Sequence, residues 1–255
     1  MSVFAGYSRY YDLLYRDKDY AGEAAYVADL IRRHAPAAKS LMEIGCGTGA
    51  HAVELAQLGF DVQGVDMSEG MLEAADARRS SLAPDLARKL EFAQGDARTV
   101  RLGKKFDAVI SLFHVMSYQT SNADLGAAFE TAREHLEPGG VFVFDCWYGP
   151  AVLRQWPSVT EKNLSDESTA VARRAEPVIH ATENVVDVNY TVVVTDRMTV
   201  ASETLKETHR MRYLFTPEIE TALSAAGMKL VDSRGWMTDS PPGFETWGAV
   251  FVGRG

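Results

Sequence analysis

The stretch Leu41-Met42-Glu43-Ile44-Gly45-Cys46-Gly47-Thr48-Gly49-Ala50 decides the fold of this chain. It predicts an apolar strand that ends in a glycine-rich turn, and this turn opens a helix over residues 50–58. The next apolar run ends in Gly64-Val65-Asp66, so a second strand delivers a carboxylate beside the turn. Glycines let the backbone approach a ligand closely, and such a carboxylate accepts hydrogen bonds from the two hydroxyls of a ribose. The pattern therefore predicts a nucleoside site.

The glycines alone leave the nucleoside open. Gly45-x-Gly47-x-x-Ala50 also fits, loosely, the dinucleotide turn of dehydrogenases. Glu43 argues against that interpretation, because a carboxylate two residues before Gly45 would repel a pyrophosphate, whereas it could hold the turn or meet a cationic ligand. A further acidic turn, Gln94-Gly95-Asp96-Ala97, follows the next apolar run.

Five motifs stand in one order along the chain: E-I-G-C-G-T-G (43–49), V-D (65–66), G-D-A (95–97), F-D-A-V-I-S (106–111) and L-E-P-G-G-V-F-V-F-D (136–145). In this order and spacing they resemble the class I S-adenosylmethionine (SAM)-dependent methyltransferases. The resemblance implies an α/β, Rossmann-like fold with a mostly parallel seven-stranded sheet whose last strand is antiparallel. It also implies SAM as the cofactor and S-adenosylhomocysteine (SAH) as its product.

Composition narrows the class of partner. The 255 residues are 46% hydrophobic and carry a formal net charge of −9, which disfavours nucleic acid and acidic membrane surfaces as partners. No apolar run has membrane-spanning length, and the N-terminus lacks a secretion signal. Two cysteines and six unpatterned histidines suggest neither a disulfide framework nor a metal site. We therefore expect a cytoplasmic protein with a small-molecule substrate and no metal; a homodimer stays open.

Strands and helices alternate between residues 40 and 145, as in a parallel sheet with crossover helices. Beyond Pro150 the pattern changes to three extended segments, 169–179, 185–195 and 204–214, rich in Val, Thr and aromatic residues. We interpret residues 151–214 as an inserted antiparallel sheet, the cap, that covers one end of the site. Residues 1–150 and 215–255 would form the core, which includes an N-terminal helical segment and a final hairpin.

The resemblance assigns parts of the cofactor to particular residues. The three turn glycines would let the backbone approach the methionine part and the ribose, and Asp66 would bind the ribose hydroxyls. Met67 would pack on the adenine, and Asp96 with Ala97 would read its amino edge. The predicted cofactor set is Tyr11, Glu43, Gly45, Cys46, Gly47, Gly49, Asp66, Met67, Asp96, Ala97 and Leu112.

His114 is the sharpest catalytic candidate, because it follows the fourth predicted strand at the edge where ligands bind in such folds. A neutral imidazole can take a proton from an attacking amine or hydroxyl; alternatively, it only orients SAM or caps a backbone group. Tyr118 could hydrogen-bond the substrate or simply pack. In similar methyltransferases an N-terminal tyrosine contacts the cofactor carboxylate. The resemblance implies Tyr11 for this role, with Tyr10 as the alternative. Otherwise these rings only pack the first helix against the core.

The cap contributes the remaining candidates. In the segment 207–215 the side chains alternate, so His209 lies on one face while Arg210 and Arg212 share the other, where they could grip a phosphate or be solvated. Trp147 and Tyr148 follow the fifth predicted strand and would line the pocket mouth. The predicted substrate set is Tyr10, His114, Tyr118, Trp147, Tyr148, His209, Arg210 and Arg212.

The cap and the N-terminal tyrosines resemble most the enzymes that N-methylate amino sugars carried on a nucleotide. The sequence therefore predicts transfer of a methyl group to an amine or hydroxyl of a small polar molecule, such as a nucleotide-linked sugar or a natural-product intermediate. The rival hypotheses are a non-catalytic SAM-binding protein and a nicotinamide-dependent dehydrogenase.

Overall fold

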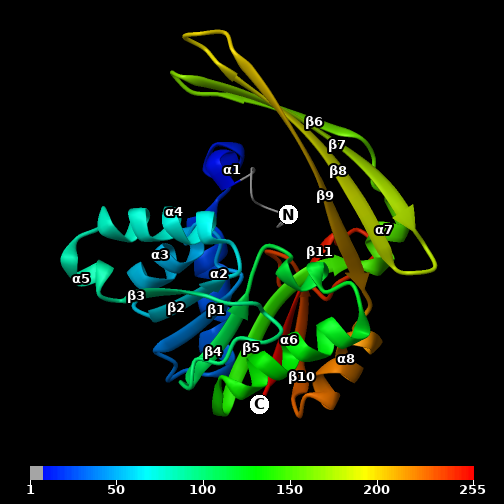
Figure 1. Cartoon of the computed structure of the whole chain (residues 1–255). Coiled ribbons are helices and arrows are strands. Elements are labelled where there is room, and N and C mark those ends of the chain that lie inside the picture. Colours follow the sequence, from blue (N-terminus) through cyan, green and yellow to red (C-terminus); the bar gives the residue numbers. More distant parts are fainter. Residues whose placement is uncertain (1–7) are drawn as a thin grey trace.

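A computed structural model describes residues 8–255, and the expectations for residues 1–7 lie outside it. Its main sheet runs in the order β3-β2-β1-β4-β5-β11-β10; the first five strands are parallel, and β11 pairs antiparallel with β5 and β10. Within the described residues this is the predicted Rossmann-like methyltransferase sheet, antiparallel last strand included (Figure 1). The strands are β1 (Ser40–Ile44), β2 (Asp61–Asp66), β3 (Leu90–Gln94), β4 (Phe106–Ser111), β5 (Leu136–Tyr148), β10 (Lys229–Gly235) and β11 (Gly248–Arg254).

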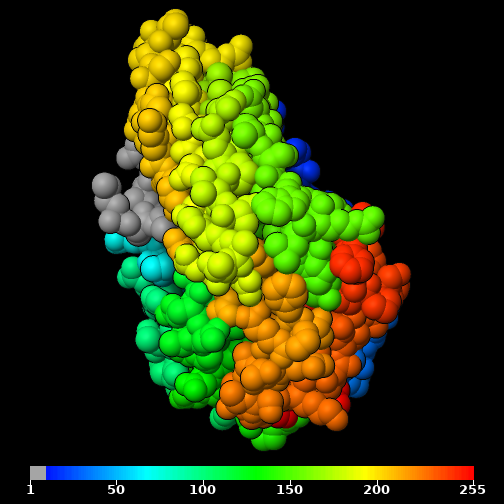
Figure 2. All heavy atoms as spheres, turned by 90° about the vertical axis from the view of Figure 1, so that its right-hand side faces the viewer, coloured from blue at the N-terminus to red at the C-terminus, as the bar shows by residue number. Residues whose placement is uncertain are grey.

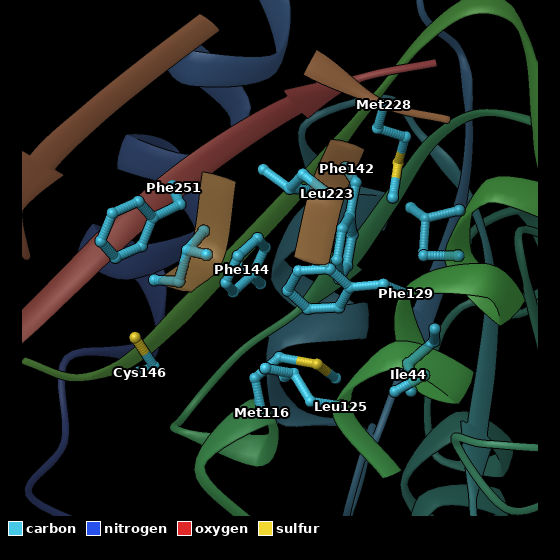
Figure 3. Close-up of a cluster of buried hydrophobic side chains, with 14 of the residues drawn as sticks. Ile44, Met116, Leu125, Phe129, Phe142, Phe144, Cys146, Leu223, Met228 and Phe251 are labelled. Atoms are coloured by element: carbon cyan, nitrogen blue, oxygen red, sulfur yellow. The ribbon is translucent and has the colours of Figure 1, made fainter. Parts of the chain in front are cut away.

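Helices cover both faces of this sheet, because each buries one apolar stripe. α2 and α3 pack on one face, and α6 and α8 pack on the other. On the second face Phe129 of α6 meets Phe142 of β5 with ring centroids 5.4 Å apart, in a cluster that Phe144 and Phe251 extend (Figure 3). The helices are α1 (Ser8–Leu14), α2 (Tyr20–His34), α3 (Ala50–Gln57), α4 (Glu69–Ser80), α5 (Pro84–Ala87), the 3-10 helix η1 (Val115–Tyr118), α6 (Asn122–Glu134), α7 (Gly149–Arg154) and α8 (Thr216–Ala225).

The cap is an antiparallel sheet in the order β9-β8-β7-β6 that stands above the core (Figure 2). It continues the main sheet, because Tyr213 and Leu214 of β9 pair in parallel with the end of β5. β6 was not expected, since Thr-Glu-Lys-Asn-Leu-Ser offers no regular apolar alternation; it forms by pairing with β7. The cap strands are β6 (Thr160–Ser165), β7 (Thr169–His180), β8 (Val185–Asp196) and β9 (Ser202–Leu214).

α1 joins the core to the cap. On the core side, Asp12 accepts a hydrogen bond of 2.7 Å from the hydroxyl of Thr48, a residue of the glycine turn. On the cap side, Lys162 of β6 donates to the carbonyl oxygen of Leu14 at 2.7 Å, and Leu14 is buried against cap valines. The N-terminal helical segment is thereby fastened beside the turn.

Candidate active site

The glycine turn needs its glycines for steric reasons. Gly45, Gly47 and Gly49 all have positive φ angles, of 77°, 54° and 73°, which side-chain-bearing residues rarely adopt. A Cβ on Gly45 would lie 2.5 Å from the side chain of Val115, and one on Gly49 would lie 2.8 Å from the ring of Phe92. Gly45 and Gly47 line a cavity, whereas Gly49 precedes α3 as its N-cap residue and lies away from the cavity.

Asp66 ties the end of β2 to this turn. Its Oδ2 accepts a hydrogen bond of 2.9 Å from the backbone N–H of Gly47, and its Oδ1 accepts one of 2.8 Å from the N–H of Ser68. Burial raises the pKa of the Asp66 carboxyl, and the backbone hydrogen bonds oppose that rise. Asp66 and the exposed Met67 both line the cavity, at the place the sequence predicts for a ribose and an adenine.

Glu43 and Cys46 lie beneath the turn and do not line the cavity. Glu43 is 1% exposed, and its Oε2 has no hydrogen-bond partner among residues 8–255. Burial, together with the negative charge of Asp66, raises the pKa of Glu43 to about 8. Among the described residues, Nδ1 of His51 on α3 lies 3.9 Å from Glu43 Oε1. Glu43 and Cys46 therefore lie on the side of the turn that faces away from the cavity. Their predicted contact with the cofactor stays a prediction.

Arg98 accompanies the acidic turn that follows β3. Its guanidinium donates to both carboxylate oxygens of Asp96, at 2.6 and 2.9 Å, and also to Asp124 of α6 at 2.9 Å. These hydrogen bonds lower the pKa of Asp96 and fix the direction of its side chain. Asp96, Ala97 and Arg98 all line the cavity. Sequence reasoning missed Arg98, although a cation two residues after an acidic turn was a visible signal.

His114 is held by a buried carboxylate. Phe113 and His114 have consecutive positive φ angles of 61° and 65°, a strained conformation that clusters at functional sites. Asp145, at 1% exposure on β5, accepts a hydrogen bond of 3.0 Å from the backbone N–H of His114. Its Oδ2 also lies 2.7 Å from His114 Nδ1, an ion-pair distance without hydrogen-bond geometry, since Nδ1 has no hydrogen-bond partner among the described residues. Asp145 closes the last predicted motif, but its pairing with His114 could not be read from the sequence.

Tyr118 meets the cap. Its hydroxyl lies 2.7 Å from Nδ1 of His209 on β9, and His209 Nε2 lies 3.2 Å from a carboxylate oxygen of Glu207. The ring of Tyr190 packs edge-on against His209, with centroids 4.8 Å apart. A core residue and a cap residue thus share one hydrogen-bonded network.

Most of these groups surround one cavity of about 520 Å³, a size usual for small-molecule sites. Its acceptors and shape fit a cationic nucleoside such as SAM: two glycines without side chains, acidic groups at two strand ends, and apolar side chains for a ring system. The cavity gathers most of the predicted residues, namely Tyr11, Gly45, Gly47, Asp66, Met67, Asp96, Ala97, Leu112, His114, Tyr118, Trp147 and His209.

The cavity also contains residues that sequence reasoning did not select. Many are aromatic, and their rings form a continuous wall: Tyr15 contacts Phe113 with centroids 5.0 Å apart, and Trp147 contacts Trp247 at 5.8 Å. These rings come from segments far apart in the chain, so no local sequence motif predicts that they line the cavity. The additional lining residues are Tyr15, Met71, Gly95, Arg98, Phe113, Val115, Gln119, Tyr190, Met211 and Trp247.

Four predicted substrate residues lie away from this cavity. Tyr10 packs in the apolar cluster between α1 and the cap, and the hydroxyl of Tyr148 lies 3.3 Å from that of Thr216. Arg210 is exposed and pairs with Glu183 and Asp187, whereas Arg212 is buried and pairs with Glu218 and Asn122. Their predicted roles stay predictions, and each arginine already has carboxylate partners.

Two negative findings concern residues 8–255 alone. No group of three or more His, Cys, Asp or Glu side chains among them is arranged to hold a metal ion. No helix formed by these residues is long and apolar enough to cross a membrane.

Comparison with known proteins gives a consistent result. A family described as "Methyltransferase domain" matches residues 41–140. The chain is 35% identical over 223 residues to dTDP-3-amino-3,4,6-trideoxy-alpha-D-glucopyranose N,N-dimethyltransferase of Streptomyces venezuelae, covering 86% of this chain and 89% of the relative. The crystal structure of Streptomyces venezuelae DesVI superposes with a TM-score of 0.79 at 33% identity, over 98% of both chains. SAM-bound CalS10, an amino pentose methyltransferase from Micromonospora echinaspora, superposes with a TM-score of 0.75 at 29% identity, over 100% of this chain and 98% of that one.

Proposed function

The chain belongs to the class I SAM-dependent methyltransferases that act on small polar molecules, and we propose that its acceptor is the amino group of a sugar carried on a nucleotide. The similarity that supports this substrate includes the cap as well as the core, because the DesVI structure superposes over 98% of both chains. That relative is named as an N,N-dimethyltransferase, so we further propose that one amine receives two methyl groups in succession.

SAM is the cofactor, and when bound it supplies a methyl carbon made electrophilic by the adjoining sulfonium. We propose that the chain holds it as the sequence predicts. Gly45 and Gly47 admit the methionine part and the ribose, and Asp66 accepts hydrogen bonds from the ribose hydroxyls. Met67 packs on the adenine, and Asp96, held by Arg98, accepts a hydrogen bond from its amino group.

The observation that carries the proposal is His114 held against buried Asp145 in the wall of this cavity. A neutral amine attacks a methyl donor through its lone pair, and the product ammonium must lose a proton before a second attack. Asp145 fixes the backbone of His114 and places a carboxylate oxygen 2.7 Å from Nδ1, and Nε2 of His114 takes that proton. Asp145 also stabilises the resulting imidazolium electrostatically. Tyr11 and Trp147 line the same cavity and would limit the space open to the methyl acceptor.

The test begins with calorimetric titration of the purified protein with SAH, with NADH as a parallel control. Methyl transfer to a dTDP-linked amino sugar is then followed by mass spectrometry, with the matching hydroxy sugar as a second acceptor. We expect SAH binding, a flat NADH trace, and a mass gain of one and then two methyl groups on the amino sugar alone. SAH binding without transfer to any amino sugar would refute the proposed acceptor; transfer to the hydroxy sugar would move the reaction to oxygen.

Three finer expectations also remain proposals. A cytoplasmic location agrees with both cysteines being free and buried. A homodimer is tested by light scattering coupled to gel filtration, and a monomer at all protein concentrations would exclude it. The division into a core of residues 1–150 and 215–255 and a cap of residues 151–214 is tested by limited proteolysis between the two.

A further inference from the structure

Tyr118, His209 and Glu207 form a chain of hydrogen bonds that crosses from the core to the cap. The phenol of Tyr118 lies at the end of η1, whereas His209 and Glu207 lie two residues apart on β9 and so share one face of that strand. The distances are 2.7 Å from the Tyr118 hydroxyl to His209 Nδ1 and 3.2 Å from His209 Nε2 to Glu207. Tyr118 and His209 line the cavity, and Glu207 stands behind them.

The partners determine which way each hydrogen bond runs. A carboxylate can only accept, so His209 must carry its proton on Nε2 in order to bond Glu207. A neutral imidazole then has a lone pair on Nδ1, and the Tyr118 hydroxyl must donate to it. Since its one proton is directed toward the cap, the phenol oxygen offers only lone pairs to any other partner.

The surroundings keep the three groups in these protonation states. Burial raises the pKa of Tyr118 well above its ordinary value, so the phenol keeps its proton. Burial lowers the pKa of His209, although Glu207 opposes this effect, so the imidazole is neutral near pH 7. Among the described residues, the titratable and charged groups facing His209 include Tyr118 on η1, Glu207 on its own strand, Tyr190 on β8 and Arg173 on β7, whose positive charge further disfavours a second one on the imidazole.

We propose that Tyr118, His209 and Glu207 act as one unit that presents the Tyr118 oxygen to the substrate solely as a hydrogen-bond acceptor, so that it holds an N–H of the attacking amine and leaves the lone pair of that amine free. The inference rests on the proposed amine acceptor and deepens it. A phenol that could donate would instead bond the lone pair itself and block attack. Tyr118 is the catalytic residue here, because it touches substrate, and His209 and Glu207 are positioning residues.

This unit selects the acceptor and makes catalysis depend on the cap. A primary or secondary amine has both a lone pair for attack and an N–H that can donate a hydrogen bond to the Tyr118 oxygen. A tertiary amine has no N–H and cannot make this hydrogen bond. The second methylation therefore still uses the contact, and a third would not. If His209 becomes protonated, Nδ1 gains a hydrogen and turns the Tyr118 proton toward the cavity, so turnover falls at acidic pH.

One test does not depend on turnover. Histidine-selective ¹⁵N NMR of the whole protein, assigned with His209→Asn, reports which nitrogen of His209 carries the proton. We expect the lone pair on Nδ1 in the wild-type protein and a shift toward the other tautomer in Glu207→Gln, because an amide can donate to Nε2. Glu203→Gln, which alters an exposed carboxylate on the same strand, should leave the spectrum unchanged. A proton on Nδ1 in the wild-type protein would overturn the inference.

A second test is a double-mutant cycle on methyl transfer. Tyr118→Phe and His209→Ala should each lower kcat roughly tenfold to a hundredfold, and the double variant should lose no more than the worse single one, because each change disables the same unit. SAH affinity should stay constant throughout. Tyr213→Phe is the matched control, since its buried hydroxyl has no hydrogen-bond partner among the described residues. If the fold-losses in kcat of the two single variants multiply in the double variant, Tyr118 and His209 act separately. If the wild-type protein shows the expected His209 tautomer but transfers no methyl group to amines, the proposed methyl acceptor is refuted instead.

Discussion

Replacing the buried Glu43 by Gln should remove a pH dependence from the stability of the protein. The Glu43 side chain is 1% exposed on β1, directly before the glycine turn. Burial, reinforced by the charge of Asp66, raises its pKa to about 8, whereas glutamate in an unfolded chain titrates near 4.3. Between these two values the folded protein binds a proton that the unfolded chain has released. The free energy of unfolding therefore falls as the pH rises through this interval.

The size of the effect follows from the shift. One pKa unit corresponds to about 1.4 kcal/mol, so the loss of stability between pH 4.5 and 8 is at most about 5 kcal/mol. Glu43→Gln keeps the shape and cannot ionise, so its stability relative to wild type should grow with pH across this interval.

Urea denaturation followed by circular dichroism at several pH values between 5 and 8.5 measures this difference. Glu203→Gln serves as the control, because its exposed carboxylate should add no comparable slope. Wild-type and Glu43→Gln curves that run parallel with pH would refute the reasoning. They would mean that Glu43 is already ionised in the folded protein.

Three further variants probe the site. Asp66→Ala should weaken SAH binding by about 1–3 kcal/mol, the cost of lost hydrogen bonds to a carboxylate, and unchanged affinity by calorimetry would remove Asp66 from the cofactor site. His114→Ala should leave SAH affinity intact and lower turnover roughly 10²–10⁴-fold, and a full-rate variant would reduce His114 to scaffolding. Gly45→Ala should lower the free energy of unfolding by more than about 1 kcal/mol, because it forces a side chain to a φ of 77° and against Val115. Gly126→Ala in α6 has open space and should be neutral or stabilising in the same urea assay, and equal behaviour of the two variants would contradict the steric argument.

The sequence by itself determined the core of this protein, because the core is built from local signals repeated in order. An apolar run, a turn that only glycine can make, and a carboxylate at the next strand end each act within a few residues of chain. The positions of Gly45, Gly47, Asp66, Asp96 and His114 around one cavity follow from these signals, since the carboxyl ends of parallel strands meet at one edge. Even the antiparallel β11 was implied, through the family resemblance.

Only the tertiary structure decided what surrounds that edge. Asp145 reaches His114, Tyr118 reaches His209, and Tyr15 joins the aromatic wall through contacts between segments far apart in the chain, for which no local pattern exists. The fate of charged side chains was equally undetermined, because charge alone does not say what will pack around it. Glu43 is sealed under the turn and Arg212 is buried with Glu218, whereas Arg210 on the same face of β9 stays exposed. Packing between distant strands sets burial, and burial sets the chemistry of each group.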